Sequence, residues 1–257
     1  PAAIHRHLAV AAEAPGSPEQ IAEALLAAAQ GLDAYEKAAC AAMGRHGAAW
    51  LRGRRNLLTH CNAGALVTSG IGTALAPIYV LHASGEDVFV YADESRPLLQ
   101  GLRLTSYELA RAGVPHAVQA DSAAAGLMRR GGVDAVIVGA DRICANGDVV
   151  NKVGTYSVAL AAHRHGVPFV VAAPLSTLDV TTPTGNDVPI EDRPSDAGAY
   201  LQTEAVPLDL SAHAPAFDVT PHELVSAFVS EAGVVEKPDK TLLEAWGEQA
   251  RGLQPGT

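Results

Sequence analysis

Short apolar runs alternate along the chain with stretches of helical character. The runs begin at residues 56, 87, 116, 133 and 168, and they read NLLTH, DVFVYAD, HAVQAD, VDAVIVGAD and PFVVAAP. The helical stretches between them lie near residues 70–83, 97–113, 121–131 and 151–166. Continuous Val- and Ile-rich runs are typical of parallel strands buried on both faces by helices. The pattern therefore predicts an α/β fold with a Rossmann-like, doubly wound, mostly parallel sheet.

The N-terminal part of the chain predicts one long helix. In GSPEQIAEALLAAAQ, Ser17 can cap the helix, a proline fits its first turn, and Gln20 completes a capping box. The helical pattern then continues through alanine-rich sequence to about residue 50. We therefore assign residues 1–54 to a helical N-terminal segment and residues 55–257 to the Rossmann-like domain.

Two segments near the C-terminus have patterns of their own. Residues 176–198 form a long, polar, proline-rich stretch, and loops of that length are uncommon unless they are functional or disordered. Residues 239–251 have the amphipathic pattern of a last helix that packs back on the body of the domain.

Composition and charge exclude several functional classes. The formal net charge is −10 and the densest basic cluster is Arg52, Arg54 and Arg55, so we expect no nucleic-acid partner. The chain has no run of about 18 apolar residues that would span a membrane, and no basic-then-apolar secretion signal opens it. Its three cysteines form no Cys-x-x-Cys pair, which favours the reducing cytoplasm over a disulfide framework.

Polar residues collect at one predicted edge of the sheet. In open α/β sheets, ligands bind outside the carboxyl ends of the parallel strands. The residues that follow the predicted strands are Cys61, Asp93, Glu94, Asp121, Asp141, Arg142 and Pro174. A thiol and several carboxylates at the same edge make it the candidate site.

Two of these residues have both a structural and a chemical interpretation. Cys61 is either a small buried core residue, as free cysteines often are, or a reactive thiol. Asp141 follows a strongly apolar strand, where its carboxylate would cap a helix, pair with Arg142 or transfer a proton. Position in the chain alone leaves these alternatives open.

Lys152 is the only lysine between residues 38 and 236. Together with Asn151, it stands at the mouth of a predicted helix. An ammonium at a helix start opposes the helix dipole, so a nearby anionic ligand would account for it. Gly70 and Gly72 also enter a predicted helix, which suits either anion binding or tight packing of helix on strand.

Other motifs are weaker or missing. Arg96 can pair with Glu94, and Gln100, one turn into a predicted helix, can face the strand-end crevice. The first strand is not followed by Gly-x-Gly-x-x-Gly, and the chain has no His-Glu-x-x-His or cysteine-pair metal motif and no Gly-x-Ser-x-Gly elbow. We therefore expect no dinucleotide, no metal and no serine-hydrolase chemistry.

Several long blocks resemble one known family, in the same order and with the expected gaps. They extend over roughly residues 40–195 and read THCNAGAL, GTAL, YADESRPLLQGLRLTSYEL, VDAVIVGADRICANGDVVNKVGTYSVAL and PFVVAAPLSTLDVTTPTGNDVPIEDR. These blocks closely resemble the methylthioribose-1-phosphate isomerases. That family belongs to a superfamily with the ribose-1,5-bisphosphate isomerases and the regulatory subunits of translation initiation factor 2B.

The resemblance implies an aldose–ketose isomerisation in methionine salvage. The implied substrate is a 5-substituted ribose 1-phosphate, foremost 5-methylthioribose 1-phosphate, and the product is the corresponding ribulose 1-phosphate. Cys61 and Asp141 match the family's catalytic pair, and Gln100, Asn151 and Lys152 match its substrate-binding positions. The resemblance also implies a homodimer that needs neither a cofactor nor a metal.

The chemistry of this reaction suits the matched residues. A sugar whose anomeric oxygen carries a phosphate cannot open freely, so we expect Asp141, with its pKa raised in an apolar pocket, to protonate the ring oxygen. Hydrogen then moves between C2 and C1, either as a proton relayed by a Cys61 thiolate, whose pKa a helix start would lower, or as a hydride. Gly70, Gly72 and Arg96 complete the set of candidate substrate-binding residues.

The chain departs from the family at its N-terminus. The family has an N-terminal domain with an RGAPAIG-like segment and a later arginine that help to hold the substrate phosphate. Here residues 1–20 resemble only the end of that domain, with Arg6 or His7 near the family's arginine. We therefore expect a phosphate pocket that is partly missing or supplied by another chain. The open alternatives are an isomerase acting on 5-deoxyribose 1-phosphate or ribose 1,5-bisphosphate, and a non-catalytic regulatory or binding protein like the initiation factor 2B subunits.

Overall fold

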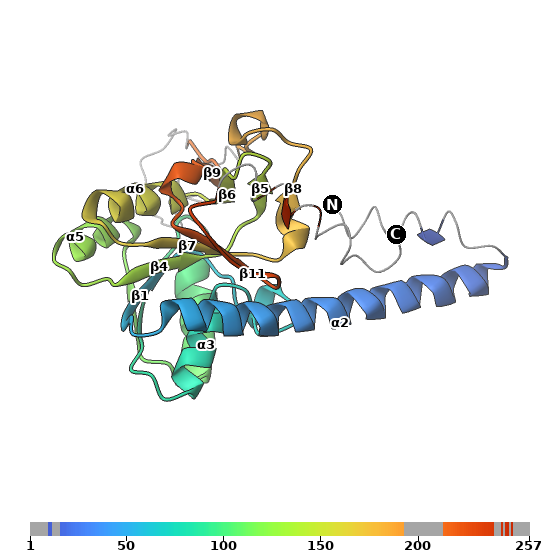
Figure 1. Cartoon of the computed structure of the whole chain (residues 1–257), viewed down its shortest axis with the longest axis horizontal. Helices are drawn as coiled ribbons and strands as arrows, with labels where there is room; N and C mark the ends of the chain where they lie inside the picture. The colour runs from blue at the N-terminus through green and yellow to red at the C-terminus, as the bar shows by residue number, and fades with distance from the viewer. Residues whose placement is uncertain are drawn as a thin grey trace, which may run out of the picture.

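A twisted sheet forms the centre of the molecule (Figure 1). The computed structural model describes residues 10, 11, 16–192, 213–238, 243, 245, 246 and 248. In that part of the chain the sheet has seven strands, in the spatial order β11 (Gly233–Glu236), β10 (Ala227–Ser230), β7 (Phe169–Ala172), β4 (Ala135–Val138), β1 (Asn56–Thr59), β2 (Phe89–Asp93) and β3 (His116–Gln119). Neighbouring strands are parallel except β10 and β11. The predicted Rossmann-like, mostly parallel sheet is confirmed.

Helices cover both faces of this sheet. They are α2 (Pro18–Leu51), α3 (Leu75–Ala83), α4 (Ser106–Arg111), α5 (Ala124–Arg129) and α6 (Thr155–His165). Alternate residues of β4 serve the two faces, because successive side chains of a strand point to opposite sides. Ala135 and Ile137 join the core with α2 and α3, whereas Val136 and Val138 join the core with α5 and α6. The sheet is therefore buried on both faces, which explains its continuous apolar runs.

The long first helix begins where its capping residues predict. The Ser17 N–H donates to Gln20 Oε1 at 2.8 Å. The buried residues of α2 lie between Ala39 and its end, and this half packs on the sheet beside α3. The first half extends away from the body of the molecule (Figure 1). Only the second half of α2 therefore belongs to the core of the domain.

A second, small sheet stands above the first, and the sequence patterns did not predict it. Its spatial order is β8 (Leu178–Asp179), β5 (Arg142–Cys144), β6 (Val149–Lys152) and β9 (Phe217–Thr220). Strands β5 and β6 form an antiparallel hairpin whose turn contains Gly147, at φ 94°. The Asp141 N–H donates to Val150 O at 3.0 Å, so the hairpin begins at Asp141 and ends at Lys152. The small sheet therefore places these two residues side by side.

The remaining segments of the described chain are short. Single 3-10 turns lie at Ala65–Val67, Asp121–Ala123, Leu175–Thr177, Gly185–Asp187 and His222–Leu224, and a π-helical turn lies at Gly101–Thr105. Leu243 and Trp246 are helical and buried in the core, which agrees with the predicted last helix. Arg6, His7 and residues 193–198 of the polar stretch lie outside the described residues.

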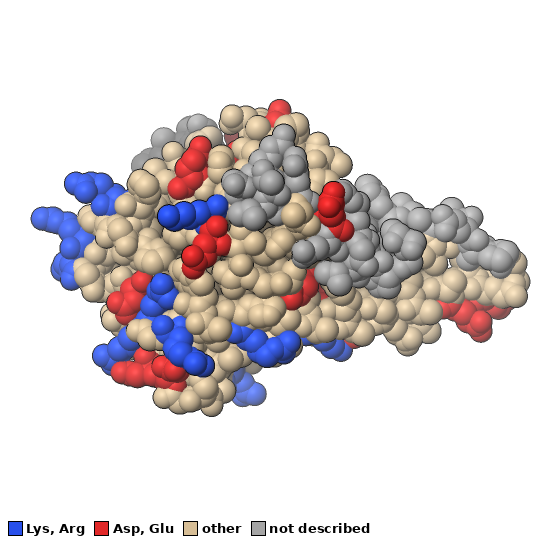
Figure 2. Space-filling view, viewed as in Figure 1, with Lys and Arg blue, Asp and Glu red and all other residues tan. Residues whose placement is uncertain are grey.

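On the face in Figure 2, the described lysine and arginine side chains are interspersed with aspartate and glutamate and form no continuous basic track. The described helices include none with the length and apolar character needed to cross a membrane.

Candidate active site

A cavity of about 480 Å³ lies at the carboxyl ends of β1, β4 and β7, beside β6 and β9 of the small sheet. Five predicted site residues line it together, namely Cys61, Gln100, Asp141, Asn151 and Lys152. They come from segments that are far apart in the sequence. The strand-end edge of the sheet is therefore the site that the sequence predicts.

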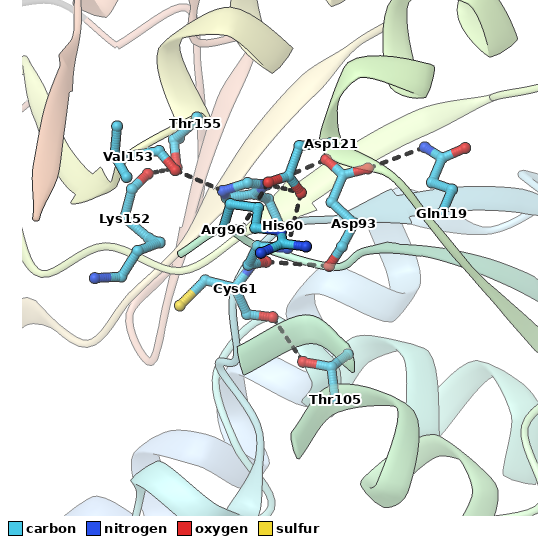
Figure 3. A network of polar contacts seen from close by, with 12 residues as sticks. His60, Cys61, Asp93, Arg96, Thr105, Gln119, Asp121, Lys152, Val153 and Thr155 are labelled. Carbon is cyan, nitrogen blue, oxygen red and sulfur yellow. Dashed lines mark hydrogen bonds and ion pairs between the residues drawn. The ribbon is translucent and has the colours of Figure 1, made fainter. Parts of the chain in front are cut away.

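Cys61 lies in an unusual backbone conformation just after β1. Its φ is +66°, in the left-handed region that costs a non-glycine residue about 1–2 kcal/mol. Its N–H donates to Ser95 Oγ at 2.6 Å, and its carbonyl accepts from Thr105 Oγ1 at 2.6 Å (Figure 3). Both hydroxyl residues are fully buried. Two buried hydroxyls therefore hold the turn that carries the thiol.

A buried carboxylate holds the loop that follows Cys61. Glu108 of α4 accepts hydrogen bonds from Asn62 Nδ2 at 3.0 Å, from Ala65 N at 2.6 Å and from Leu66 N at 3.2 Å. It also accepts from the Tyr79 hydroxyl at 3.2 Å. These bonds satisfy the N–H groups of Ala65 and Leu66 and fix the loop, whose residues Asn62, Ala63 and Val67 line the cavity.

The thiol of Cys61 is less acidic than the sequence suggested. Burial raises its pKa, while the Asn62 N–H and the Lys152 ammonium lower it and the charge of Asp141 raises it further; the net pKa is raised. No helix begins at Cys61, and the nearest turn of helix starts at Ala65. The expectation that a helix start lowers this pKa is therefore wrong, and the protonated thiol is the stable form at neutral pH.

Asp141 lines the cavity, and its carboxyl group neither caps a helix nor pairs with the neighbouring Arg142. A strand follows it rather than a helix, so it caps no helix. Its neighbour Arg142 instead pairs with Asp179, with 2.8 Å between Nη1 and Oδ2. Among the described residues, none donates a hydrogen bond to the Asp141 carboxylate. Burial by the cavity walls raises its pKa, against the opposing charge of Lys152, as predicted for an acid.

Lys152 supplies a buried positive charge to the cavity. It is the last residue of β6 and not, as predicted, part of a helix start. Its Nζ donates to Ala216 O at 2.9 Å and lies 4.7 Å from the centre of the Phe217 ring. The N-terminus of α6 is instead satisfied by Asp218, whose carboxylate accepts from Gly154 N at 2.7 Å. The ammonium is therefore held by a carbonyl and a ring face. Among the described residues no carboxylate forms an ion pair with it, although its charge lowers the pKa of Asp141 and Asp218.

Asn151 and Gln100 add amide groups to the same cavity. Asn151 Nδ2 donates to Thr155 Oγ1 at 3.1 Å. The Gln100 Oε1 atom is buried and has no hydrogen-bond partner among the described residues. Because buried polar atoms are nearly always paired, this oxygen is suited to a donor on a ligand.

Three candidate residues lie outside the cavity lining. Arg96 is exposed, and its Nε lies 3.6 Å from Glu94 Oε1. A Cβ on Gly70 would stand 2.7 Å from a side-chain carbon of α2. Gly72 has φ 96°, and a Cβ there would stand 2.6 Å from Gly64 Cα. The two glycines therefore permit close packing, which is the second of the two interpretations.

Several cavity-lining residues were not predicted from the sequence, and Glu36 and Phe217 are two of them. Glu36 comes from α2, and Phe217 comes from β9 next to the cation of Lys152. Neither residue lies in a motif, and each reaches the cavity only through tertiary packing. The aromatic ring beside the ammonium is the feature that a sequence pattern could not supply.

Two clusters of described residues have metal-ligating atoms close together: His60, Asp93 and Asp121, and Asp148, His222 and Glu223. In the first cluster, the two oxygens of Asp121 accept from Ser95 N and Arg96 N, each at 2.7 Å. In the second, Asp148 accepts from Gly185 N at 3.0 Å and from the backbone of its neighbour in the cluster. The ligating oxygens thus already have donors, and we assign no metal to either cluster.

Comparisons with known proteins show the family of the chain. A profile of the Initiation factor 2 subunit family matches residues 2–237. The chain is 50% identical over 236 residues to a methylthioribose-1-phosphate isomerase of Chloroflexus aurantiacus, covering 91% of this chain and 67% of that protein. It is 49% identical over 233 residues to a 5-deoxyribose 1-phosphate isomerase of Moorella thermoacetica, covering 90% of this chain and 66% of that protein.

A solved structure has the same fold. The crystal structure of 5-methylthioribose 1-phosphate isomerase from Pyrococcus horikoshii matches with a TM-score of 0.87 at 39% identity, over 95% of this chain and 69% of that one. The chain thus spans about two thirds of the length of the curated relatives it matches. With the shared fold and 50% identity over 236 residues, the chain belongs to the initiation factor 2 subunit family, among its methylthioribose-1-phosphate isomerases.

Proposed function

We propose that this protein isomerises a 5-substituted ribose 1-phosphate, foremost 5-methylthioribose 1-phosphate, to the corresponding ribulose 1-phosphate. The observation that carries the proposal is one cavity that holds Cys61, Asp141 and Lys152 together. A place in methionine salvage, which the resemblance implies, is part of the proposal. A homodimer in the cytoplasm belongs to the same proposal.

Asp141 acts as the acid that opens the sugar ring. The phosphate on the anomeric oxygen blocks spontaneous opening, so the ring oxygen must receive a proton as the C1–O bond breaks. A carboxyl group with a raised pKa remains protonated closer to neutral pH and is suited to general acid catalysis. The lack of hydrogen bonds from other described residues leaves the carboxyl group free to face the substrate.

Cys61 takes part in the hydrogen transfer between C2 and C1. A thiol with a raised pKa is a weak base, which favours a hydride shift from C2 to C1, with Cys61 as a hydrogen-bond donor beside the reacting carbons. As C2 becomes a carbonyl, its hydroxyl proton passes to the carboxylate of Asp141, which has already given its own proton to the ring oxygen. A proton relay instead requires the thiolate, and Lys152 is the residue whose charge favours that form. The fate of a C2 label distinguishes the two routes.

The cavity suits an uncharged 5-substituent. Lys152 is the one lysine or arginine among the described residues that line it, and it would face the 1-phosphate. Val67, Leu98 and Phe217 supply apolar wall. A second phosphate, as in ribose 1,5-bisphosphate, would meet this wall without a cation, so a methylthio or methyl group fits better. The Moorella relative named for 5-deoxyribose 1-phosphate makes that sugar the second candidate substrate.

Purified full-length protein is expected to convert 5-methylthioribose 1-phosphate to its ketose, with 5-deoxyribose 1-phosphate as a poorer substrate. Ketose formation measured by NMR checks this, with ribose 1,5-bisphosphate as the charged comparison. A preference for the bisphosphate would contradict the substrate assignment. No product from any of the three sugars would favour a regulatory or binding protein like the initiation factor subunits.

The buried hydroxyls at the Cys61 turn provide a second prediction. Thr105→Val keeps the shape of the side chain but removes the donor to the Cys61 carbonyl. We expect kcat to fall about tenfold, the equivalent of one lost hydrogen bond in a strained turn. Thr105→Ser restores the donor and is expected to restore kcat. Equal kcat values for the valine and wild-type proteins would mean that the hydroxyl does not hold the thiol in place.

A further inference from the structure

His60, the residue before Cys61, is a buried part of the cavity lining, and its ring makes two hydrogen bonds. Its exposed fraction is 1%. Its Nδ1 lies 3.1 Å from Asp93 Oδ2, and its Nε2 lies 2.9 Å from Val153 O (Figure 3). Both partners are acceptors. A neutral imidazole has only one N–H and would point a lone pair at one of these oxygens, whereas an imidazolium donates to both.

The groups around the ring favour a positive charge. Asp93 of β2 is fully buried, and its other oxygen accepts from Gln119 Nε2 at 2.9 Å, which marks it as an acceptor on both sides. Asp121 Oδ1 lies 3.9 Å from Nδ1. Burial raises the pKa of Asp218 of β9 to about 6, and the charge on His60 is one of the interactions that oppose this rise. Lys152 of β6 is the opposing cation nearby. Three carboxylates thus face the ring against one ammonium.

The two bonds of His60 join the two halves of the site. On one side, the next residue is Cys61 at the end of the large sheet. On the other, the acceptor carbonyl belongs to Val153, which follows Lys152 at the end of β6 in the small sheet. A Cβ on Gly154 would stand 2.7 Å from His60 Cε1, so the ring also packs directly on this turn. His60 therefore connects the turn that carries Cys61 with the turn that follows Lys152.

We propose that His60 is a buried imidazolium that positions Cys61 against Lys152 by bridging Asp93 and the Val153 carbonyl. It is a positioning residue, since both of its ring nitrogens are occupied by Asp93 and the Val153 carbonyl and it acts through the residues on either side of the bridge. This inference rests on the proposed function for its catalytic consequence but not for its charge state. Although burial lowers the pKa of His60, the bond with Asp93 and the charge of Asp121 raise it, and the net pKa is raised.

The charge state is tested in the unaltered full-length protein. With ¹⁵N-labelled histidine assigned through the backbone, both ring nitrogens of His60 are expected to carry a proton at pH 7.5, when exposed histidines are neutral. The same measurement on Asp93→Asn is expected to show a neutral ring, because the counter-charge is gone. A neutral His60 in the unaltered protein overturns the proposal, whatever the activity of the enzyme.

The positioning role is tested on His60→Gln, whose amide reaches one of the two acceptors. We expect kcat to fall about 10- to 100-fold with KM little changed, and the pH profile of Cys61 alkylation by iodoacetamide to shift. The matched control is His163→Gln, an exposed residue in the last turn of α6, which is expected to change neither. Thermal unfolding reports whether each variant is folded, and Asp93→Asn takes the place of His60→Gln if the latter does not fold.

The outcomes separate this inference from the proposed function. A doubly protonated ring with wild-type kcat and wild-type alkylation in His60→Gln overturns the positioning role. If the unaltered protein converts no sugar phosphate, the proposed function fails, while the NMR and alkylation results still decide the inference. A doubly protonated ring together with altered thiol reactivity in His60→Gln supports it.

Discussion

Replacing Asp141 with asparagine is expected to lower kcat about a thousandfold and to change KM little. The amide has the size of the carboxyl group but cannot transfer a proton to the ring oxygen, and loss of a general acid typically has an effect of this order. The substitution breaks no hydrogen bond to the carboxylate from another described residue, so the fold is expected to tolerate it. Steady-state turnover of 5-methylthioribose 1-phosphate measures the effect.

The control for this variant is Asp87→Asn. Asp87 lies just before β2 at the opposite end of the strands, where its exposed carboxylate pairs with Arg55. The pH profile adds a second readout. Because the acid must be protonated and its pKa is raised, kcat/KM of the unaltered enzyme falls as pH rises through that pKa, and Asp141→Asn lacks this limb. Near-normal turnover in Asp141→Asn would remove Asp141 from the reaction.

Replacing Cys61 with alanine is expected to lower kcat about 10²- to 10⁴-fold, because no donor or base then stands beside C1 and C2. Alanine meets the same left-handed backbone strain as cysteine, so the turn itself changes little. Cys61→Ser keeps a hydroxyl donor and is expected to retain more activity than alanine if hydride shifts, but not if a thiolate relays a proton. The measurement is single-turnover conversion of the sugar phosphate.

The matched control is Cys144→Ala, a buried cysteine of β5 that does not line the cavity. Its kcat is expected to stay at the wild-type value. A substrate labelled with deuterium at C2 completes the test, since a hydride shift retains the label in the product and a proton relay releases it to water. Wild-type kcat in both Cys61 variants would show that the thiol has no part in the hydrogen transfer.

The large sheet was predictable because its strands are buried on both faces. β4 has no polar alternation, and its Val and Ile side chains fill both cores, so its pattern is visible in the sequence. The small sheet was missed because its strands contain as few as two residues and carry site residues on their ends. The sequence pattern therefore placed Asn151 and Lys152 at the start of α6, although they are the last two residues of β6. Their pairing with β9, more than 60 positions away, is set by tertiary contacts.

The rule that ligands bind at the carboxyl ends of parallel strands predicted where the site lies. Cys61 and Asp141 follow β1 and β4, which are neighbours in the sheet, so their meeting follows from the topology. The acidity of the thiol was not predictable, because it depends on burial and on charges from two other strands. The role of His60 was equally hidden, since both of its acceptors lie far from it in the sequence.

The left-handed turn at Cys61 sets stability and chemistry against each other. A glycine at this position would adopt φ +66° without strain and is expected to make the fold more stable. The cysteine thus stands where the backbone favours glycine, and the proposed role of its thiol accounts for that cost. Under this proposal, Cys61→Gly is expected to unfold at a higher temperature and to lose turnover, so the most stable sequence and the active one differ at this position.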